Sequence, residues 1–97
     1  MIRSFKNKCA EDVYHGVNST AARKLPRQLH ELAGEKLDIL EAAQELEDMR
    51  VPPGNRLEKL KGDLRDKYSI RINDQRRIVF AWREGQVEEV EIIDYHH

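Results

Sequence analysis

The sequence has few of the residues on which several classes of site depend. Cys9 is the only cysteine among 97 residues, which excludes an intrachain disulfide and a cysteine-rich metal site. The histidines, at positions 15, 30, 96 and 97, do not have the spacing of metal ligands. We therefore expect neither a metal nor a cofactor.

Long apolar runs are also missing. No stretch approaches the ~18 consecutive apolar residues of a membrane span, and the N-terminus lacks the apolar core of a signal peptide. Aromatic residues make up 6% and charged residues 36%, which is typical of a domain with a crowded polar surface. The length fits one small domain over residues 1–97 with a modest core. We expect a cytoplasmic protein that does not associate with membranes.

The net charge of −1 conceals a segregated pattern. Acidic residues predominate over 31–48 and 84–94, whereas residues 56–77 contain eight basic side chains against four acidic ones. A domain that is neutral overall can still steer a polyanion to such a basic segment. The alternative is that the acidic and basic segments pair with one another on folding.

Helical signals dominate the first half of the chain. A short helix is expected over 8–15, closed by Gly16 as a C-cap, and residues 17–24 form a loop. The clearest helix runs over 26–45, with an apolar stripe at helical spacing formed by Leu29, Leu32, Ala33, Leu37, Leu40 and Ala43. A further helical turn over 46–49 must end before the double proline of 51–54.

Strand signals frame the helices. Strands are expected over 2–5, 57–60, 68–73, 76–82 and 87–95, with a turn at 62–63. Three-residue loops at 73–75 and 84–86 keep the apolar side chains on one face, because a shift by one residue would expose them. The first loop sets Ile70 opposite Ile78. The second sets Phe80 opposite Val90. The order of elements predicts an α+β fold in which helices cover one face of an antiparallel sheet.

The same register places Arg71 directly opposite Arg77, with Tyr95 on their face of the sheet. Like charges in that position destabilise a sheet, so the pair either awaits an anion or is neutralised by nearby carboxylates. Trp82 shares the parity of Ile78, which favours a place in the core over a role in stacking a base.

Cations, a phenol and an imidazole are expected near this hairpin: Lys59, Lys61, Arg65, Arg71, Arg77, Tyr95 and His96. RNA cleavage requires a base to take the 2′-OH proton, cations to stabilise charge on the phosphate, and an acid to protonate the leaving 5′-oxygen. Histidine and lysine can serve in proton transfer, and arginine matches phosphate with its planar fork. The alternative for the two lysines is an ordinary solvated edge strand, and the last residues of a chain often have no special role.

Several motifs in the right order resemble the HigB-like toxins, the "plasmid maintenance killer" branch of the RelE/ParE superfamily. They are P-P-G-N-R-L at 52–57, L-K-G-D at 60–63, Y-S-I-R-I-N at 68–73, R-R-I at 76–78 and D-Y-H at 94–96. The resemblance implies a small RelE-like fold and the toxin half of a type II toxin–antitoxin module. Such toxins are typically metal-independent, ribosome-dependent mRNA endoribonucleases that arrest growth.

The resemblance implies a catalytic set of His96, Lys61, Arg77, Tyr95 and Asp94, with His96 in proton transfer. Lys61 and Arg77 would hold the phosphate, Tyr95 would orient or stack the substrate, and Asp94 would orient a cation or the imidazole. RNA contacts are expected at Lys59, Arg65, Arg71 and Arg76. Glu58 stands where the resemblance places a second histidine in some HigB enzymes, so we expect an activity that is weak or that relies more on Lys59 and Lys61.

The implied partners are a helix-turn-helix antitoxin of the HigA type, the ribosome and mRNA, with operator DNA contacted only through the antitoxin. Two alternatives remain open. One is a toxin without nuclease activity that acts on DNA gyrase, as in the ParE branch. The other is a catalytically weak toxin that serves mainly as a scaffold for its antitoxin.

Overall fold

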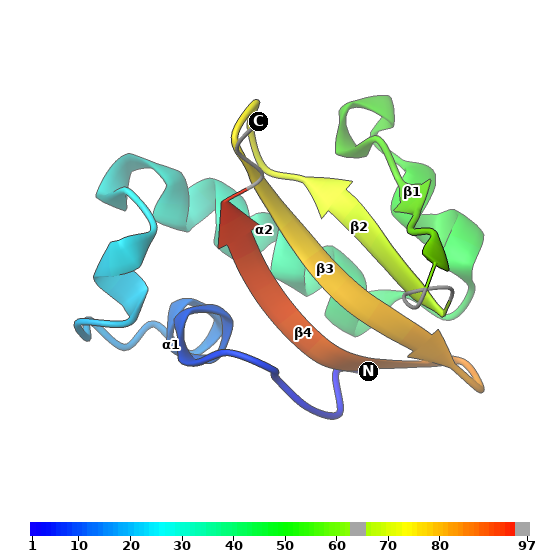
Figure 1. Cartoon of the computed structure of the whole chain (residues 1–97), viewed down its shortest axis with the longest axis horizontal. Helices are drawn as coiled ribbons and strands as arrows, with labels where there is room; N and C mark the ends of the chain where they lie inside the picture. The colour runs from blue at the N-terminus through cyan, green and yellow to red at the C-terminus, as the bar shows by residue number, and fades with distance from the viewer. Residues whose placement is uncertain (63–65, 95–97) are drawn as a thin grey trace.

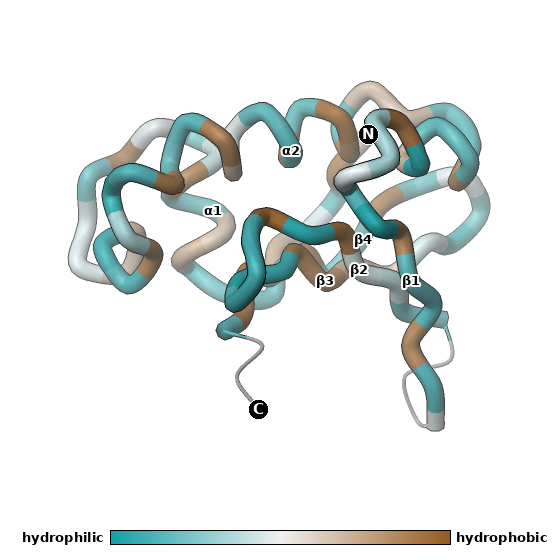
Figure 2. Tube along the Cα trace, turned by 90° about the horizontal axis from the view of Figure 1, so that it is seen from above, coloured by the Kyte–Doolittle hydropathy of each residue, from teal (hydrophilic) through white to brown (hydrophobic). Residues whose placement is uncertain are grey.

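A four-stranded antiparallel sheet forms the centre of the molecule (Figure 1). The computed structural model describes residues 1–62 and 66–94. The strands are β1 (Glu58–Lys59), β2 (Lys67–Arg71), β3 (Arg76–Arg83) and β4 (Gln86–Asp94), and they lie side by side in chain order. Helices α1 (Lys8–His15) and α2 (His30–Ala42) lie on one side of this sheet (Figure 2). The predicted α+β fold is confirmed.

Helix α1 has the predicted bounds because both of its ends are capped. The Asn7 side chain accepts a hydrogen bond from the Ala10 N–H, which satisfies one free donor of the first turn. Gly16 ends the helix in the left-handed region at φ 71°, and its N–H donates to backbone carbonyls of the last turn.

Helix α2 is shorter than the predicted helix over 26–45. Residues Arg27–Leu29 form a 3₁₀ turn (η2) after Pro26, so the α-helix begins at His30. It ends at Ala42 because the capping box of the next turn begins at Glu45, where the Asp48 carboxylate accepts from two backbone N–H groups. That turn, η3 (Leu46–Arg50), confirms the expected helical turn before the prolines. Two further 3₁₀ turns are η1 (Ala22–Lys24) and η4 (Pro53–Asn55).

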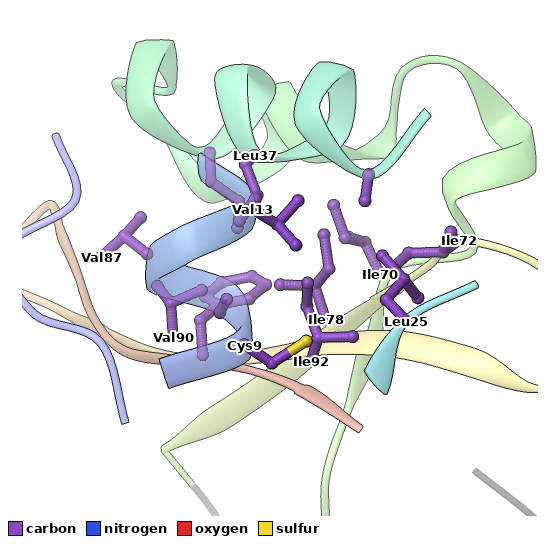
Figure 3. Packing of buried hydrophobic residues seen from close by; sticks show 14 of the residues in the cluster. Cys9, Val13, Leu25, Leu37, Ile70, Ile72, Ile78, Val87, Val90 and Ile92 are labelled. Carbon is purple, nitrogen blue, oxygen red and sulfur yellow. The ribbon is translucent and has the colours of Figure 1, made fainter. Parts of the chain in front are cut away.

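The core lies between the sheet and the helices (Figure 3). Ile78 and Phe80 of β3 are fully buried, as are Ala33, Leu37 and Leu40 from the predicted apolar stripe of α2. The rest of the sheet contributes Ile70, Val87, Val90 and Ile92, and α1 contributes Cys9, Ala10 and Val13. Trp82 is partly buried against this cluster, in agreement with its expected place in the core.

The first hairpin has the predicted register. Tyr68 pairs with Phe80, Ile70 with Ile78, and Arg71 with Arg77. The Asn73 side chain holds the three-residue loop, since its Oδ1 accepts from the N–H groups of Gln75 and Arg76. The apolar set therefore faces the helices, and Arg71 and Arg77 face away from them.

The second hairpin corrects the prediction of a three-residue loop. Arg83 pairs with Gln86, so the loop is Glu84-Gly85 alone, and both residues have positive φ, at 52° and 76°. Two successive left-handed residues match the twist of the strands. Because this loop is one residue shorter than predicted, the pairing near it is shifted by one residue. A β-bulge opposite Phe80, where Glu89 has φ 53°, reverses this shift. Beyond the bulge Ile78 pairs with Ile92, as expected.

Glu84 gives a stability prediction, because a left-handed backbone strains most side chains but suits asparagine. We expect Glu84→Asn to raise the free energy of unfolding by about 0.5–1 kcal/mol. Glu84 is exposed, so Glu84→Gln keeps the strain and should leave the stability unchanged. Urea unfolding followed by circular dichroism measures both. Equal stability of the two variants would show that the turn carries no strain.

The two short predicted strands, over 2–5 and 57–60, form less strand structure than expected. Over 2–5 the chain makes isolated parallel bridges from Ile2 to Val87 and from Phe5 to Val90. The bulge interrupts this pairing, and the Glu89 N–H there donates to the Ser4 hydroxyl. The expected strand over 57–60 contains two residues, β1. Among the described residues, no helix is long and apolar enough to span a membrane.

Candidate functional site

Two of the predicted site residues, Arg71 and Arg77, lie on the face of the sheet turned away from the helices. We call it the open face and define it by the residues whose pairing and parity place them there: Glu58, Lys67, Ser69, Arg71, Arg77, Val79, Glu91 and Ile93. Two of these side chains, Val79 and Ile93, are apolar, and the others are polar or charged. Sequence parity alone located this face, because side chains alternate along a strand.

Arg77 is the best-ordered cation on the open face. It is only 8% exposed, and its Nε donates to the Ser69 hydroxyl at 2.8 Å. Its Nη2 donates to the Arg56 carbonyl at 2.6 Å and to the Ser69 carbonyl at 3.4 Å. Among the described residues no partner is recorded for Nη1. The guanidinium is therefore held in place with one nitrogen left to donate to an anion.

Glu58 lies near Arg77 but makes only a weak contact with its guanidinium. Its carboxylate lies 3.9 Å from Nη2 of Arg77 and is itself exposed. At that distance in a solvated position the attraction is weak, so Glu58 does not neutralise Arg77. Glu58 therefore lies next to the guanidinium that the sequence predicts as a phosphate ligand.

The P-P-G-N-R segment, residues 52–56, helps to hold the Arg77 guanidinium in place. Asn55 is fully buried, and its Nδ2 donates to the carbonyls of Met49 and Val51, both at 3.1 Å. Its Oδ1 accepts from the Lys36 ammonium. Arg56 follows in the left-handed region, φ 45°, which turns its carbonyl toward Arg77. Sequence reasoning used this segment as a family motif and missed its role in positioning the guanidinium.

The other two arginines of the hairpin are paired with carboxylates. Arg71 pairs with Asp74 in the turn, and Arg76 Nη1 lies 3.3 Å from Asp94. Arg76 has the parity of Ile78 and lines a separate hollow of about 210 Å³ with Cys9 and other residues at the edge of the sheet. Neutralisation by carboxylates thus accounts for Arg71, whereas Arg77 keeps an unshared nitrogen. The roles of Arg71, Arg76 and Asp94 toward RNA stay predictions.

The lysines flank the open face at its β1 edge. Lys59 and Lys61 are exposed, and Lys61 contributes to a hollow of about 300 Å³ beside Arg77. Lys67, which the sequence did not single out, lines the same hollow and is almost entirely buried. Its place in the sequence could have indicated a position on the open face, because Lys67 has the same parity along β2 as Ser69 and Arg71.

A charge cluster lies at the far end of β3. Arg83 contacts Asp66 at 2.7 Å, Glu89 at 2.8 Å and Glu88 at 3.2 Å. The hydrogen bond from Arg83 lowers the pKa of Asp66, and Lys67 and Arg83 together lower the pKa of Glu89. Asp66 and Glu89 therefore stay ionised near neutral pH and are poor candidates for a general acid.

Three predicted site residues, Arg65, Tyr95 and His96, lie outside the described residues, as does Asp63 of the expected turn. Another hollow, of about 580 Å³, is on the helix side, between α1, η1 and α2. It contains His30 and Arg23 but none of the predicted site residues. Within 1–62 and 66–94, no three histidine, cysteine or acidic side chains come together as a metal site would require.

Comparison with known proteins decides the family. The model of the HigB-like toxins, RelE-like toxins of type II toxin–antitoxin systems, matches residues 3–96. The chain belongs to this family. Toxin HigB-1 of Vibrio cholerae is 41% identical over 85 residues, which cover 88% of this chain and 87% of that protein. A Haemophilus influenzae protein without an assigned function is 36% identical over 64 residues, or 66% of this chain and 63% of its own length.

Solved structures confirm the RelE-like fold of this HigB-like toxin. The YoeB–YefM toxin–antitoxin complex of Staphylococcus aureus matches with a TM-score of 0.60 and 18% identity, covering 100% of this chain and 99% of the other. The YoeB/ParE toxin of Agrobacterium tumefaciens matches with a TM-score of 0.56 and 17% identity, covering 98% and 99%. At these identities the likeness concerns the fold and does not extend to individual site residues.

Proposed function

We propose that this HigB-like toxin is a ribosome-dependent endoribonuclease that cleaves translated mRNA and so arrests growth. One observation carries the proposal: a buried arginine, held by Ser69 and the Arg56 carbonyl, keeps one guanidinium nitrogen for an anion on the open face. A fixed cation of this kind stabilises charge that develops on a phosphate in the transition state. The charge pattern around it, with Lys59 and Lys61 at the rim, fits a polyanionic substrate.

In the proposed mechanism, side chains of this protein hold the phosphate and protonate the leaving group without a metal. A base takes the proton of the 2′-OH, whose oxygen attacks the adjacent phosphorus and displaces the 5′-oxygen. Nη1 of Arg77 donates to a non-bridging phosphate oxygen, with Lys61 nearby. His96, the leading candidate for proton transfer, protonates the leaving 5′-oxygen, and Tyr95 orients the substrate. The ribosome holds the mRNA in place, which lets a small set of groups suffice.

Glu58 affects the expected rate. A carboxylate can accept a proton, but a second anion beside the phosphate repels it. Because Glu58 lies near Arg77 Nη2 on its exposed side, the repulsion acts on the bound substrate. We therefore expect cleavage that is slower than in a relative with histidine at this position.

The proposal includes an antitoxin partner in the cytoplasm. Two S. aureus YoeB structures contain the antitoxin YefM, and they share the fold of this chain. We propose that a helix-turn-helix antitoxin of the HigA type neutralises this toxin, and that operator DNA is bound through the antitoxin alone.

Mapping of mRNA ends tests the function directly. We expect new 5′ ends inside translated reading frames within minutes of inducing the toxin without its antitoxin, and none when translation initiation is blocked. Inhibition of DNA gyrase without mRNA cuts would instead indicate a ParE-like toxin. Antitoxin binding with neither cuts nor growth arrest would indicate a scaffold.

A further inference from the structure

A buried lysine that the proposed mechanism does not use, Lys67, lines the hollow beside Arg77. The side chain of Lys67 is 7% exposed, and its Nζ has no hydrogen-bond partner among the described residues. Its recorded contact is an ion pair with Glu89 Oε1 at 3.2 Å. An ammonium has three N–H donors, so the single contact with Glu89 leaves at least two of them without an acceptor, which destabilises the folded protein at a buried position. An acceptor brought into the hollow would remove this cost.

The hollow has the composition of a nucleotide site. Its floor is apolar, from Leu60, Val79 and Ile93, and its rim carries the exposed cations Lys6 and Lys61. Glu91 is the acidic residue lining it, and Lys6 already pairs with that carboxylate at 3.5 Å. An apolar floor suits the face of a base, and rim lysines suit its phosphate.

The position of the hollow relative to Arg77 fits the neighbouring nucleotide of a bound strand. Ile93 lies directly opposite Arg77, and Val79 is two residues farther along β3 on the same face. Two residues along a strand span roughly 7 Å. A nucleotide in the hollow therefore lies next to a phosphate held by Arg77.

We propose that this hollow binds one RNA nucleotide beside the cleaved phosphate, and that Lys67 selects its base by donating hydrogen bonds to acceptor atoms on the base edge. This inference rests on the proposed RNA substrate and adds a subsite to it. Lys67 can reach an acceptor by rotating the end of its flexible stem. Glu89, at the bulge behind it, holds the ammonium when the subsite is empty.

Binding of uncleavable RNA tests the subsite apart from catalysis. The probes are RNA trinucleotides with 2′-deoxy sugars, which lack the attacking hydroxyl, and the base is varied at each position in turn. We expect wild-type affinity to vary at least threefold with the base at one position. Lys67→Met should lower the affinity about five- to tenfold and remove that variation. Where Lys67→Met does not fold, Lys67→Arg, which keeps the charge but changes the donor geometry, should shift the preferred base.

Two control variants separate recognition from a structural role. Glu89→Gln removes the ion-pair partner but keeps the ammonium, so it should bind RNA at least as tightly as the wild type. Lys8→Met removes a lysine ion pair on α1 and should leave RNA binding unchanged. The subsite is rejected if the wild type shows no base preference, if Lys67→Met behaves like Lys8→Met, or if Glu89→Gln loses as much affinity as Lys67→Met. Lysine-dependent binding without any mRNA cleavage would retain the subsite and reject the proposed nuclease.

Discussion

Arg77→Ala should lower the rate of ribosome-dependent mRNA cleavage about 100- to 1000-fold and relieve growth arrest. On the described part of the open face, Arg77 is the only cation that is buried and not paired tightly with a carboxylate. Three acceptors hold its guanidinium: the hydroxyl and the carbonyl of Ser69 and the carbonyl of Arg56. Cleavage of a defined mRNA on purified ribosomes measures the rate, and growth after induction gives the cellular readout. His96→Ala should have a comparable effect through loss of proton transfer.

Matched variants separate charge from orientation at this position. Arg77→Lys keeps the charge but cannot donate to Ser69 and a phosphate in the same plane, so we expect it to recover only part of the rate. Ser69→Ala keeps Arg77 but removes the acceptor of its Nε, and should cost about tenfold in rate with little change in substrate affinity. Thermal unfolding of each variant confirms that the protein is folded. Full toxicity of both Arg77→Ala and His96→Ala would rule out the proposed site.

The sheet register could be predicted because burial leaves little freedom along β2 and β3. A slip of one residue would expose Ile70, Ile78 and Phe80 together, which is why their pairing followed from alternation alone. The second turn could not be predicted in the same way. A two-residue loop with a bulge at Glu89 and a three-residue loop without one give the same pairing of Ile78 with Ile92. The apolar pattern does not distinguish them.

The open face shows a similar division. Parity placed Arg71 and Arg77 on one face, but it did not show that Asp74 pairs with Arg71 while Arg77 keeps a free nitrogen. That difference depends on which carboxylates the loops bring close, and loops follow backbone geometry that the hydrophobic pattern does not encode. Lys67 could not be predicted as a site residue for the same reason, because its burial depends on how side chains pack around the hollow.

Asn55→Ala should be the most destabilising of the single substitutions considered, costing about 3 kcal/mol in the free energy of unfolding. It leaves the carbonyls of Met49 and Val51 without a donor, removes the acceptor of Lys36 and opens a void at a fully buried position. For a domain of this size the melting temperature should fall by roughly 10–20 °C. Asn18→Ala is the matched control, since Asn18 is exposed and bonds only to Arg23 among the described residues, and should cost less than about 0.5 kcal/mol.

The same substitution tests whether the P-P-G-N-R segment positions Arg77, the arginine that we propose to be catalytic. Asn55 fixes the backbone that presents the Arg56 carbonyl, and this carbonyl holds Nη2 of Arg77 at 2.6 Å. At a temperature where Asn55→Ala remains folded, we expect cleavage to slow about tenfold with substrate affinity nearly unchanged, because a displaced guanidinium meets the phosphate poorly in the transition state. Lys36→Met removes the donor to Oδ1 alone and should reproduce the stability loss in part while leaving the rate close to that of the wild type. A folded Asn55→Ala protein that cleaves at the wild-type rate would limit Asn55 to a structural role.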